Sequence, residues 1–136
     1  MNIKIIGLDI SRKRIGMSIG IYQNNNHIIT PFNVLEEYSD FMVIETLKKL
    51  KKDYNPNNFV IGLPSKSYEN AKFIKHFVHK YREYLKPFIY QNEDYTTFLS
   101  NLNNLDNNKN KKYSEKKNDD LAASIILERF FNCEKY

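Results

Sequence analysis

Ile5-Ile6-Gly7-Leu8-Asp9 is the stretch that decides the fold, because an apolar run ends there in a carboxylate. Residues 2–9 as a whole contain three isoleucines and one leucine. Such a mostly β-branched run predicts a buried strand. Asp9 then stands at the end of a strand, where acidic residues from other segments can join it.

Two other carboxylates have the same kind of place in the chain. Glu93 follows the apolar run Phe88-Ile89-Tyr90, and Asp119 precedes the largely apolar run over 121–127. Three carboxylates brought together form a cage of hard oxygen ligands for divalent metal ions. Metal ions in such a cage activate water for attack on a phosphodiester. We therefore interpret Asp9, Glu93 and Asp119 as the catalytic and metal-binding residues of a nuclease.

The other segments predict an α/β fold. Further strands are expected over 14–22, from 27, over 59–63 and over 87–90. Helices are expected over 40–53, 68–84, 94–105 and 119–131, and a polar, lysine-rich loop over 106–117. Three strands in succession predict an antiparallel meander, and the later alternation of helix and strand predicts parallel crossovers. We expect one domain over residues 1–136, with a mixed five-stranded sheet and helices on both of its faces.

Two of the expected helices have apolar faces. The helix over 40–53, which Ser39 or Asp40 can cap, is expected to place on one face Phe41, Ile44, Leu47 and Leu50. In the helix over 68–84 the aromatic residues keep helical spacing, which indicates core packing rather than base stacking. These residues are Phe73, Phe77 and Tyr81.

The composition limits the partners. The chain has 136 residues, a formal net charge of +5 at pH 7 and a single cysteine, Cys133. An isoelectric point near 9.2 favours an anionic partner such as a nucleic acid. The apolar runs are far shorter than the ~20 residues of a membrane span, so no membrane partner is expected. One cysteine excludes an internal disulfide and suits a reducing cytosol, so we expect a cytoplasmic protein.

Five short motifs occur in a fixed order along the chain. They are Gly7-Leu8-Asp9, Lys13-Arg14-Ile15-Gly16, Gly62-Leu63-Pro64, Glu93 with Thr96-Thr97, and Asp119 with Ala122-Ala123 and Ile125-Ile126-Leu127. With these motifs, over residues 5–131, the chain resembles the YqgF family, also called RuvX, of the ribonuclease-H-like superfamily.

The resemblance implies a ribonuclease-H-like fold and a nuclease that matures the 5′ end of pre-16S rRNA. It assigns the acidic positions to Asp9, Glu93 and Asp119, with Mg²⁺ or Mn²⁺ as the cofactor. We expect Asp9 to bridge two ions roughly 4 Å apart and the other two acids to complete one ion each. Structured RNA is the favoured partner, with branched DNA and pre-ribosomal particles as further partners of a monomer or weak homodimer.

Basic residues near the carboxylates are natural contacts for phosphate groups, which position a nucleic acid without reading its sequence. Arg12, Lys13 and Arg14 follow Asp9 closely, and Lys117 precedes Asp119. A lysine-rich approach to the site predicts salt-dependent binding. The residues expected to contact substrate are Arg12, Lys13, Arg14, Lys66, Thr96 and Lys117.

Three departures from the family pattern keep other functions open. Ile10-Ser11-Arg12 stands where the family has Pro-Gly-Thr, the loop over 65–70 is shorter, and Asp94 replaces an arginine. Loss of the glycine alters a tight turn that brings backbone close to phosphate. One alternative is therefore a catalytically degenerate RNA-binding factor in ribosome assembly. The other is a Holliday-junction resolvase acting on four-way DNA.

Each of the three acids also has another interpretation. Asp9 could form an Asx turn at the end of its strand, since Ser11 follows it. Glu93 could be a first-turn helix residue stabilised by the helix dipole, with its neighbour Asp94 as the ligand instead. Asp119 competes with its neighbour Asp120, and either could cap the last helix. The position relative to Ile125-Ile126-Leu127 favours Asp119 as the ligand, with Asp120 as a helper.

Overall fold

The computed structural model describes residues 2–93 and 115–134, with the backbone alone at residues 93, 115–121, 133 and 134. Within these residues the strands are β1 (Ile3–Ile10), β2 (Arg14–Gln23), β3 (Asn26–Glu36), β4 (Asn58–Pro64) and β5 (Phe88–Glu93). They form one sheet in the order β3-β2-β1-β4-β5. β2 is antiparallel to β1 and β3, whereas β4 is parallel to β1 and β5. The predicted mixed sheet is confirmed.

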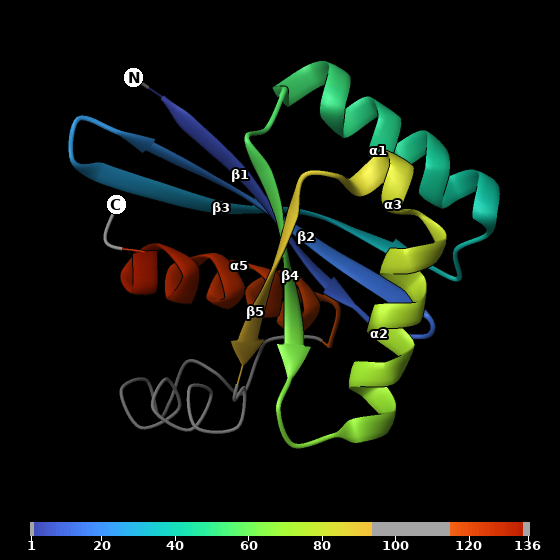
Figure 1. Ribbon diagram of the computed structural model, residues 1–136. Helices are drawn as coiled ribbons and strands as arrows, with labels where there is room; N and C mark the ends of the chain where they lie inside the picture. The colour runs from blue at the N-terminus through green and yellow to red at the C-terminus, as the bar shows by residue number, and fades with distance from the viewer. Residues whose placement is uncertain (1, 94–114, 135–136) are drawn as a thin grey trace.

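Helices cover both faces of the sheet, as the sequence predicts (Figure 1). On one face lie α1 (Asp40–Tyr54), α2 (Tyr68–Lys80) and the short α3 (Arg82–Leu85). α5 (Glu115–Glu134) lies on the other face. Ser39 caps α1 by accepting a hydrogen bond from the Met42 amide. Across the described part of the chain, no helix combines the length and apolarity needed to cross a membrane.

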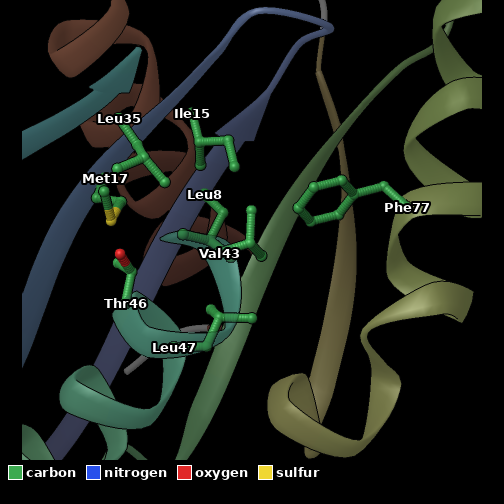
Figure 2. Close-up of a pocket in the computed structure, with 8 residues that line it drawn as sticks. All are labelled: Leu8, Ile15, Met17, Leu35, Val43, Thr46, Leu47 and Phe77. Atoms are coloured by element: carbon green, nitrogen blue, oxygen red, sulfur yellow. The ribbon is translucent and has the colours of Figure 1, made fainter. Parts of the chain in front are cut away.

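The side chains of β1 alternate between two cores. Ile6, Leu8 and Ile10 belong to the core under α1 and α2, and Ile5 belongs to the core under α5. The first core contains a void of about 10 Å³, which is close to the minimum for one water molecule. Figure 2 shows the side chains that line it. Its lining is almost wholly apolar, so the void is a packing defect rather than a ligand site. The lining residues are Leu8, Ile15, Met17, Leu35, Val43, Thr46, Leu47 and Phe77.

α5 docks closely on the sheet over Gly7 and Ser18, which are paired across β1 and β2. A Cβ atom added at Gly7 would lie 2.8 Å from Cγ of Leu127 and 3.0 Å from the Ala123 carbonyl oxygen. The Ser18 side chain is fully buried, and its hydroxyl donates a 2.8 Å hydrogen bond to the same Ala123 oxygen. A small residue on each strand therefore lets the helix approach the sheet and ties it there.

The contacts of α5 show that it runs antiparallel to β1. Ala123 and Leu127 lie over Gly7, and Phe131 lies over Gly20 of β2. Gly20 is the partner of Ile5, which is nearer the beginning of β1. The chain of α5 thus advances toward the beginning of β1. Its N-terminal turns therefore lie toward the carboxyl end of β1.

The predicted apolar face of α1 is partly wrong. The helix buries Val43, Leu47 and Leu50, whereas Phe41 is 73% exposed. Phe41 is two residues, or about 200° of helix rotation, from Val43 and therefore lies on the opposite side. The single helix predicted over 68–84 is also corrected. Tyr81, with φ −108° and ψ 19°, separates α2 from α3.

The last helix is longer than predicted. α5 spans Glu115–Glu134 rather than 119–131, so Lys117 is part of a helix and not of a loop. Its first residues, Glu-Lys-Lys, are good helix formers and extend the helix toward its N-terminus. The predicted helix over 94–105 and the loop over 106–114 lie outside the described residues.

Gly7→Ala should reduce stability, because its Cβ would meet a helix carbonyl oxygen that cannot swing away. Overpacking of this kind costs about 1–3 kcal/mol in the free energy of unfolding, which urea denaturation measures. Gly20→Ala is the matched comparison, since its Cβ would meet side-chain atoms of Phe131 and Leu127, which can shift. It should cost less. A smaller loss for Gly7→Ala than for Gly20→Ala would contradict the close docking of α5 at Gly7.

Candidate active site

Asp9 lies near the end of β1, on the face of the sheet that α5 covers. The alternation along β1 assigns this face, because Ile5 and Gly7 contact α5. The partner of Asp9 on β2 is Gly16, which adds no side chain beside the carboxylate. Asp9 is half-buried, so it keeps partial access to solvent at the edge of the sheet.

Glu93 is the last residue of β5 and is therefore not a first-turn helix residue. β1, β4 and β5 are parallel neighbours, so their carboxyl ends meet at one edge of the sheet. The register aligns Gly7 with Val60 and Val60 with Ile89, which places position 93 on the same face as Asp9. β5 lies two strands away from β1, and Glu93 lies two residues beyond the level of Asp9. The Cα atoms of Asp9 and Glu93 are therefore roughly 12 Å apart.

The backbone of Asp119 lies over the same edge. Asp119 precedes Ala123 by four residues, which advance an α-helix by about 6 Å. Asp9 follows Gly7 by two residues, which advance a strand by about 6.6 Å. Ala123 contacts Gly7, and α5 is antiparallel to β1, so the two steps run in the same direction. Position 119 is therefore next to Asp9.

The middle strand adds no side chain between these positions. Ile61 of β4 pairs with Leu8, so Gly62 follows at the level of Asp9. Gly62 is on the α5 face, as Val60 is, and contributes no side chain there. Asp9 and the backbone positions 93 and 119 therefore border a part of the sheet to which Gly62 adds no side chain. Carboxylate oxygens are ligands that hard divalent cations prefer.

The choice between Asp119 and Asp120 stays a prediction. α5 begins at Glu115, so neither residue caps it. Position 119 is four residues before Ala123, and position 120 is seven residues before Leu127. Both positions therefore continue the stripe of α5 that faces the sheet. Among the side chains that the structure describes, which do not include Glu93 and Asp119, no three His, Cys, Asp or Glu residues gather.

The turn after Asp9 closes without a glycine. The Ser11 amide donates to the Arg14 carbonyl at 2.8 Å, and the Ser11 hydroxyl accepts from the Arg14 amide at 3.1 Å. Ser11 thus closes the β1–β2 turn, whose residues do not need the left-handed conformation that favours glycine. In the described ranges, the non-glycine residues with positive φ are Asn24, Asn25, Glu37 and Asn55.

The predicted basic contacts lie at several places around this edge. Arg12 and Lys13 are exposed at the tip of the β1–β2 turn, and Lys66 is exposed in the loop between β4 and α2. Arg14 is half-buried and forms a 3.7 Å ion pair with Glu36 of β3. The Arg14 side chain is 38% exposed, and its contact with substrate stays a prediction.

Two other predicted contacts can be placed only in part. Lys117 lies in α5, two residues before Asp119, where the structure describes its backbone. Thr96 lies outside the described residues, as does Asp94.

A polar cluster beside the Arg12 turn is not predicted from the sequence. Asp40 accepts hydrogen bonds from the Lys80 ammonium, at 2.8 Å, and from the Tyr81 phenol. These two hydrogen bonds lower the pKa of Asp40, and the bond to Asp40 raises the pKa of Lys80. Burial raises the pKa of the Tyr81 phenol. The cluster ties the start of α1 to the end of α2, and no local spacing signals residues forty positions apart.

The docking contact of α5 is also not predicted, although the sequence carries a signal for it. Gly16, Ser18 and Gly20 alternate along β2, and Gly7 is the partner of Ser18. Small residues on one face of two paired strands indicate close approach of another backbone.

Comparison with known proteins identifies the family. Residues 3–133 match the family model RuvX, described as Holliday junction resolvase. A protein of Francisella philomiragia named "Putative pre-16S rRNA nuclease" is 34% identical over 129 residues, which cover 91% of this chain and 93% of that protein. Proteins of the same name from Sulfurihydrogenibium sp. and Francisella tularensis are 29% and 32% identical. These matches cover 95% and 94% of this chain and 90% and 96% of those proteins.

Solved structures share the fold at low sequence identity. The fowlpox virus Holliday junction resolvase aligns with a TM-score of 0.52 and 19% identity, over 96% of this chain and 99% of that chain. RuvC of T. thermophilus, solved with a Holliday junction substrate, aligns with a TM-score of 0.50 and 10% identity, over 66% of this chain and 63% of that one. The fold is therefore ribonuclease-H-like. Because the family model matches nearly the whole chain, this protein belongs to the RuvX family.

Proposed function

We propose that this protein is a divalent-metal-dependent nuclease that cuts structured RNA and matures the 5′ end of pre-16S rRNA. Asp9, Glu93 and Asp119 are its catalytic and metal-binding residues. The observation that carries the proposal is the convergence of these three positions on one face, at the carboxyl edge of β1, β4 and β5. The names of the relatives from Francisella support the RNA substrate. The protein acts in the cytoplasm, as a monomer or weak homodimer.

The donor set determines which cofactor fits. Carboxylate oxygens are the ligands that Mg²⁺ and Mn²⁺ prefer. Either ion, when bound, would lower the pKa of an attacking water molecule and stabilise the leaving oxygen of the phosphodiester. Asp9, on the central strand, and Glu93 and Asp119 are the residues that would hold the metal.

Other residues of the chain position the substrate. Arg12 and Lys13 follow Asp9 by three and four residues and are exposed, so they can contact phosphates on either side of the cut. Gly62 adds no side chain at the level of Asp9 on the neighbouring strand. The neighbours of β1 on both sides, β2 and β4, hold Asp9 in a fixed position. Such preorganisation keeps the reacting groups aligned.

Holliday-junction resolution is the second candidate, and the description of the family model favours it. Symmetric cuts in two strands require a two-fold dimer that presents two sites. Within the described residues, the exposed large apolar side chains are scattered over four elements, which does not favour a continuous dimer surface. They are Ile28 on β3, Phe41 on α1, Tyr68 on α2 and Ile89 on β5. We therefore rank RNA processing first.

A binding factor without catalysis is the third candidate. One reason for it is the missing glycine after Asp9, but Ser11 closes that turn with three hydrogen bonds to Arg14. The other reason is the acid at position 94, and Asp94 lies outside the described residues. An intact set of three acids favours the enzyme over the binding factor.

Asp9→Asn should abolish cleavage and preserve the fold, because a neutral amide is a poor ligand for two dications. The measurement is cleavage of a labelled pre-16S rRNA fragment in Mn²⁺ and in EDTA. Asp53→Asn removes the same charge from the exposed end of α1, at the opposite edge of the sheet, and should cleave like the parent. Cleavage by Asp9→Asn at the parental rate would contradict the assignment. A parent that cuts four-way DNA junctions symmetrically, and leaves the RNA intact, would make resolution the better candidate.

Mn²⁺ should also raise the melting temperature of the parent, because a ligand that binds only the folded state stabilises it. Asp119→Ala should remove most of this shift. Asp120→Ala is the matched control and should retain it if Asp119 is the ligand. Absence of any shift in the folded parent would rule out the metal site, and a shift lost only in Asp120→Ala would reassign the ligand.

A further inference from the structure

α2 starts at the catalytic edge of the sheet and crosses the face opposite to α5 (Figure 1). β4 ends at Pro64, which pairs with Glu93. Ser67 then caps α2 by accepting a hydrogen bond from the Asn70 amide, and Tyr68 is the first helical residue. The first turn of α2 is therefore close to the carboxyl ends of the strands that carry the acids.

The outward face of α2 carries a continuous stripe of basic and aromatic side chains. The helix buries Ile74, Phe77 and Val78. Four exposed basic residues follow Tyr68 by four, seven, eight and eleven residues. This is the spacing of side chains on one face of a helix. We call this set the α2 stripe, and its members are Tyr68, Lys72, Lys75, His76 and His79. Tyr68 is 79% exposed, so its ring is available for contact with a ligand.

A hollow of about 310 Å³ connects the α2 stripe with the turn after Asp9. Its lining consists of Arg12, Glu69, Lys72, Phe73 and His76. The Arg12 guanidinium lies 4.9 Å over the Phe73 ring, a cation–π contact that holds the arginine at the hollow.

The turn itself is held in place by a residue before α1. The Tyr38 phenol donates a 2.7 Å hydrogen bond to the Ser11 carbonyl. Arg12 therefore stands at a fixed place between the catalytic edge and the α2 stripe.

The charge of the chain is concentrated on this face. Residues 40–86 contain ten Lys and Arg against five Asp and Glu, which is a net charge of +5 and equals that of the whole chain. Two of these acids are paired with lysines, Asp40 with Lys80 at 2.8 Å and Glu83 with Lys86 at 3.1 Å. Glu69 lines the hollow, beside Arg12 and Lys72. Such a surface attracts a polyanion.

We propose that the α2 stripe and the hollow at Arg12 bind an unpaired strand of the nucleic acid next to the phosphodiester that is cut. A row of cations follows the phosphates of a single strand, and an exposed aromatic ring stacks on one of its bases. The bases of a duplex are enclosed in its own stack, so Tyr68 has no partner along a duplex. That the ligand is a nucleic acid rests on the proposed function. The inference adds that the substrate has an unpaired segment beside the cut.

The first test separates this surface from the general positive charge. A fluorescein-labelled 20-nucleotide RNA without secondary structure is titrated by fluorescence anisotropy, without divalent ions, at several salt concentrations. Lys72→Gln/Lys75→Gln should reduce the slope of log affinity against log salt by about 1.4, since each cation on a single strand accounts for about 0.7. Lys49→Gln/Lys52→Gln has the same spacing on exposed positions of α1 and should leave the slope unchanged.

The second test concerns stacking. Tyr68→Ala should weaken binding of the single strand by about 5- to 150-fold, the range that loss of one stacked base produces. Tyr68→Phe keeps the ring and should bind like the parent. Phe41→Ala removes an equally exposed ring from α1 and should also bind like the parent. Binding of a blunt duplex of the same sequence should not change in Tyr68→Ala.

The outcomes distinguish this proposal from the proposed function. A parent that does not bind the single strand would overturn the proposal. So would equal losses in the two lysine pairs, equal losses in Tyr68→Ala and Phe41→Ala, or an equal loss of duplex binding in Tyr68→Ala. Melting curves of each variant show whether a loss reflects unfolding. A parent that binds the strand through the α2 stripe but cuts no RNA in Mn²⁺ would contradict the nuclease and leave the binding surface intact.

Discussion

The contact of α5 with Gly7 and Ser18 is the constraint on which the proposed catalytic edge depends. Asp9 and Glu93 stand on strands whose positions are set by backbone pairing, but the third acid stands on a helix, which could slide or rotate on a sheet. The 2.8 Å hydrogen bond from Ser18 to the Ala123 carbonyl sets the position along the helix. The missing side chain of Gly7 sets the distance from the sheet. Together they hold position 119 one turn beyond the contact, over Asp9.

We propose different roles for the two faces of the sheet. Asp9 and the positions 93 and 119 lie on the face under α5, where Gly16 and Gly62 add no side chains beside Asp9. The opposite face carries α1 and α2, which bury the larger core and concentrate the positive charge outside it. The β1–β2 turn joins the two faces, because Arg12 leaves the strand of Asp9 and contacts Phe73 of α2. A strand bound along α2 would thus be led to the carboxylates.

Local signals in the sequence predict most of the fold. Apolar runs that end in acids place Asp9 and Glu93 at strand ends, and Ser39 marks the start of α1. The side of α1 that faces the core is not predicted, because the burial of Val43 rather than Phe41 is decided by the sheet beneath it. The start of α5 is also missed, since Glu-Lys-Lys suits a polar loop as well as an exposed helical turn. The three acids of the proposed site come from the sequence and stay a prediction. The docking at Ser18 and the Asp40–Lys80 pair could not be predicted, because they depend on long-range contacts.

The central claim is that Asp9, Glu93 and Asp119 together form one divalent-metal site. A crystal structure of the protein with Mn²⁺, with anomalous scattering measured near the manganese edge, tests it most directly. The account predicts anomalous peaks within bonding distance of the carboxylate oxygens of these residues, with Asp9 shared if two peaks appear. An ordered edge without a peak, in crystals saturated with Mn²⁺, would contradict the account. A manganese ion bound only by other residues would contradict it equally.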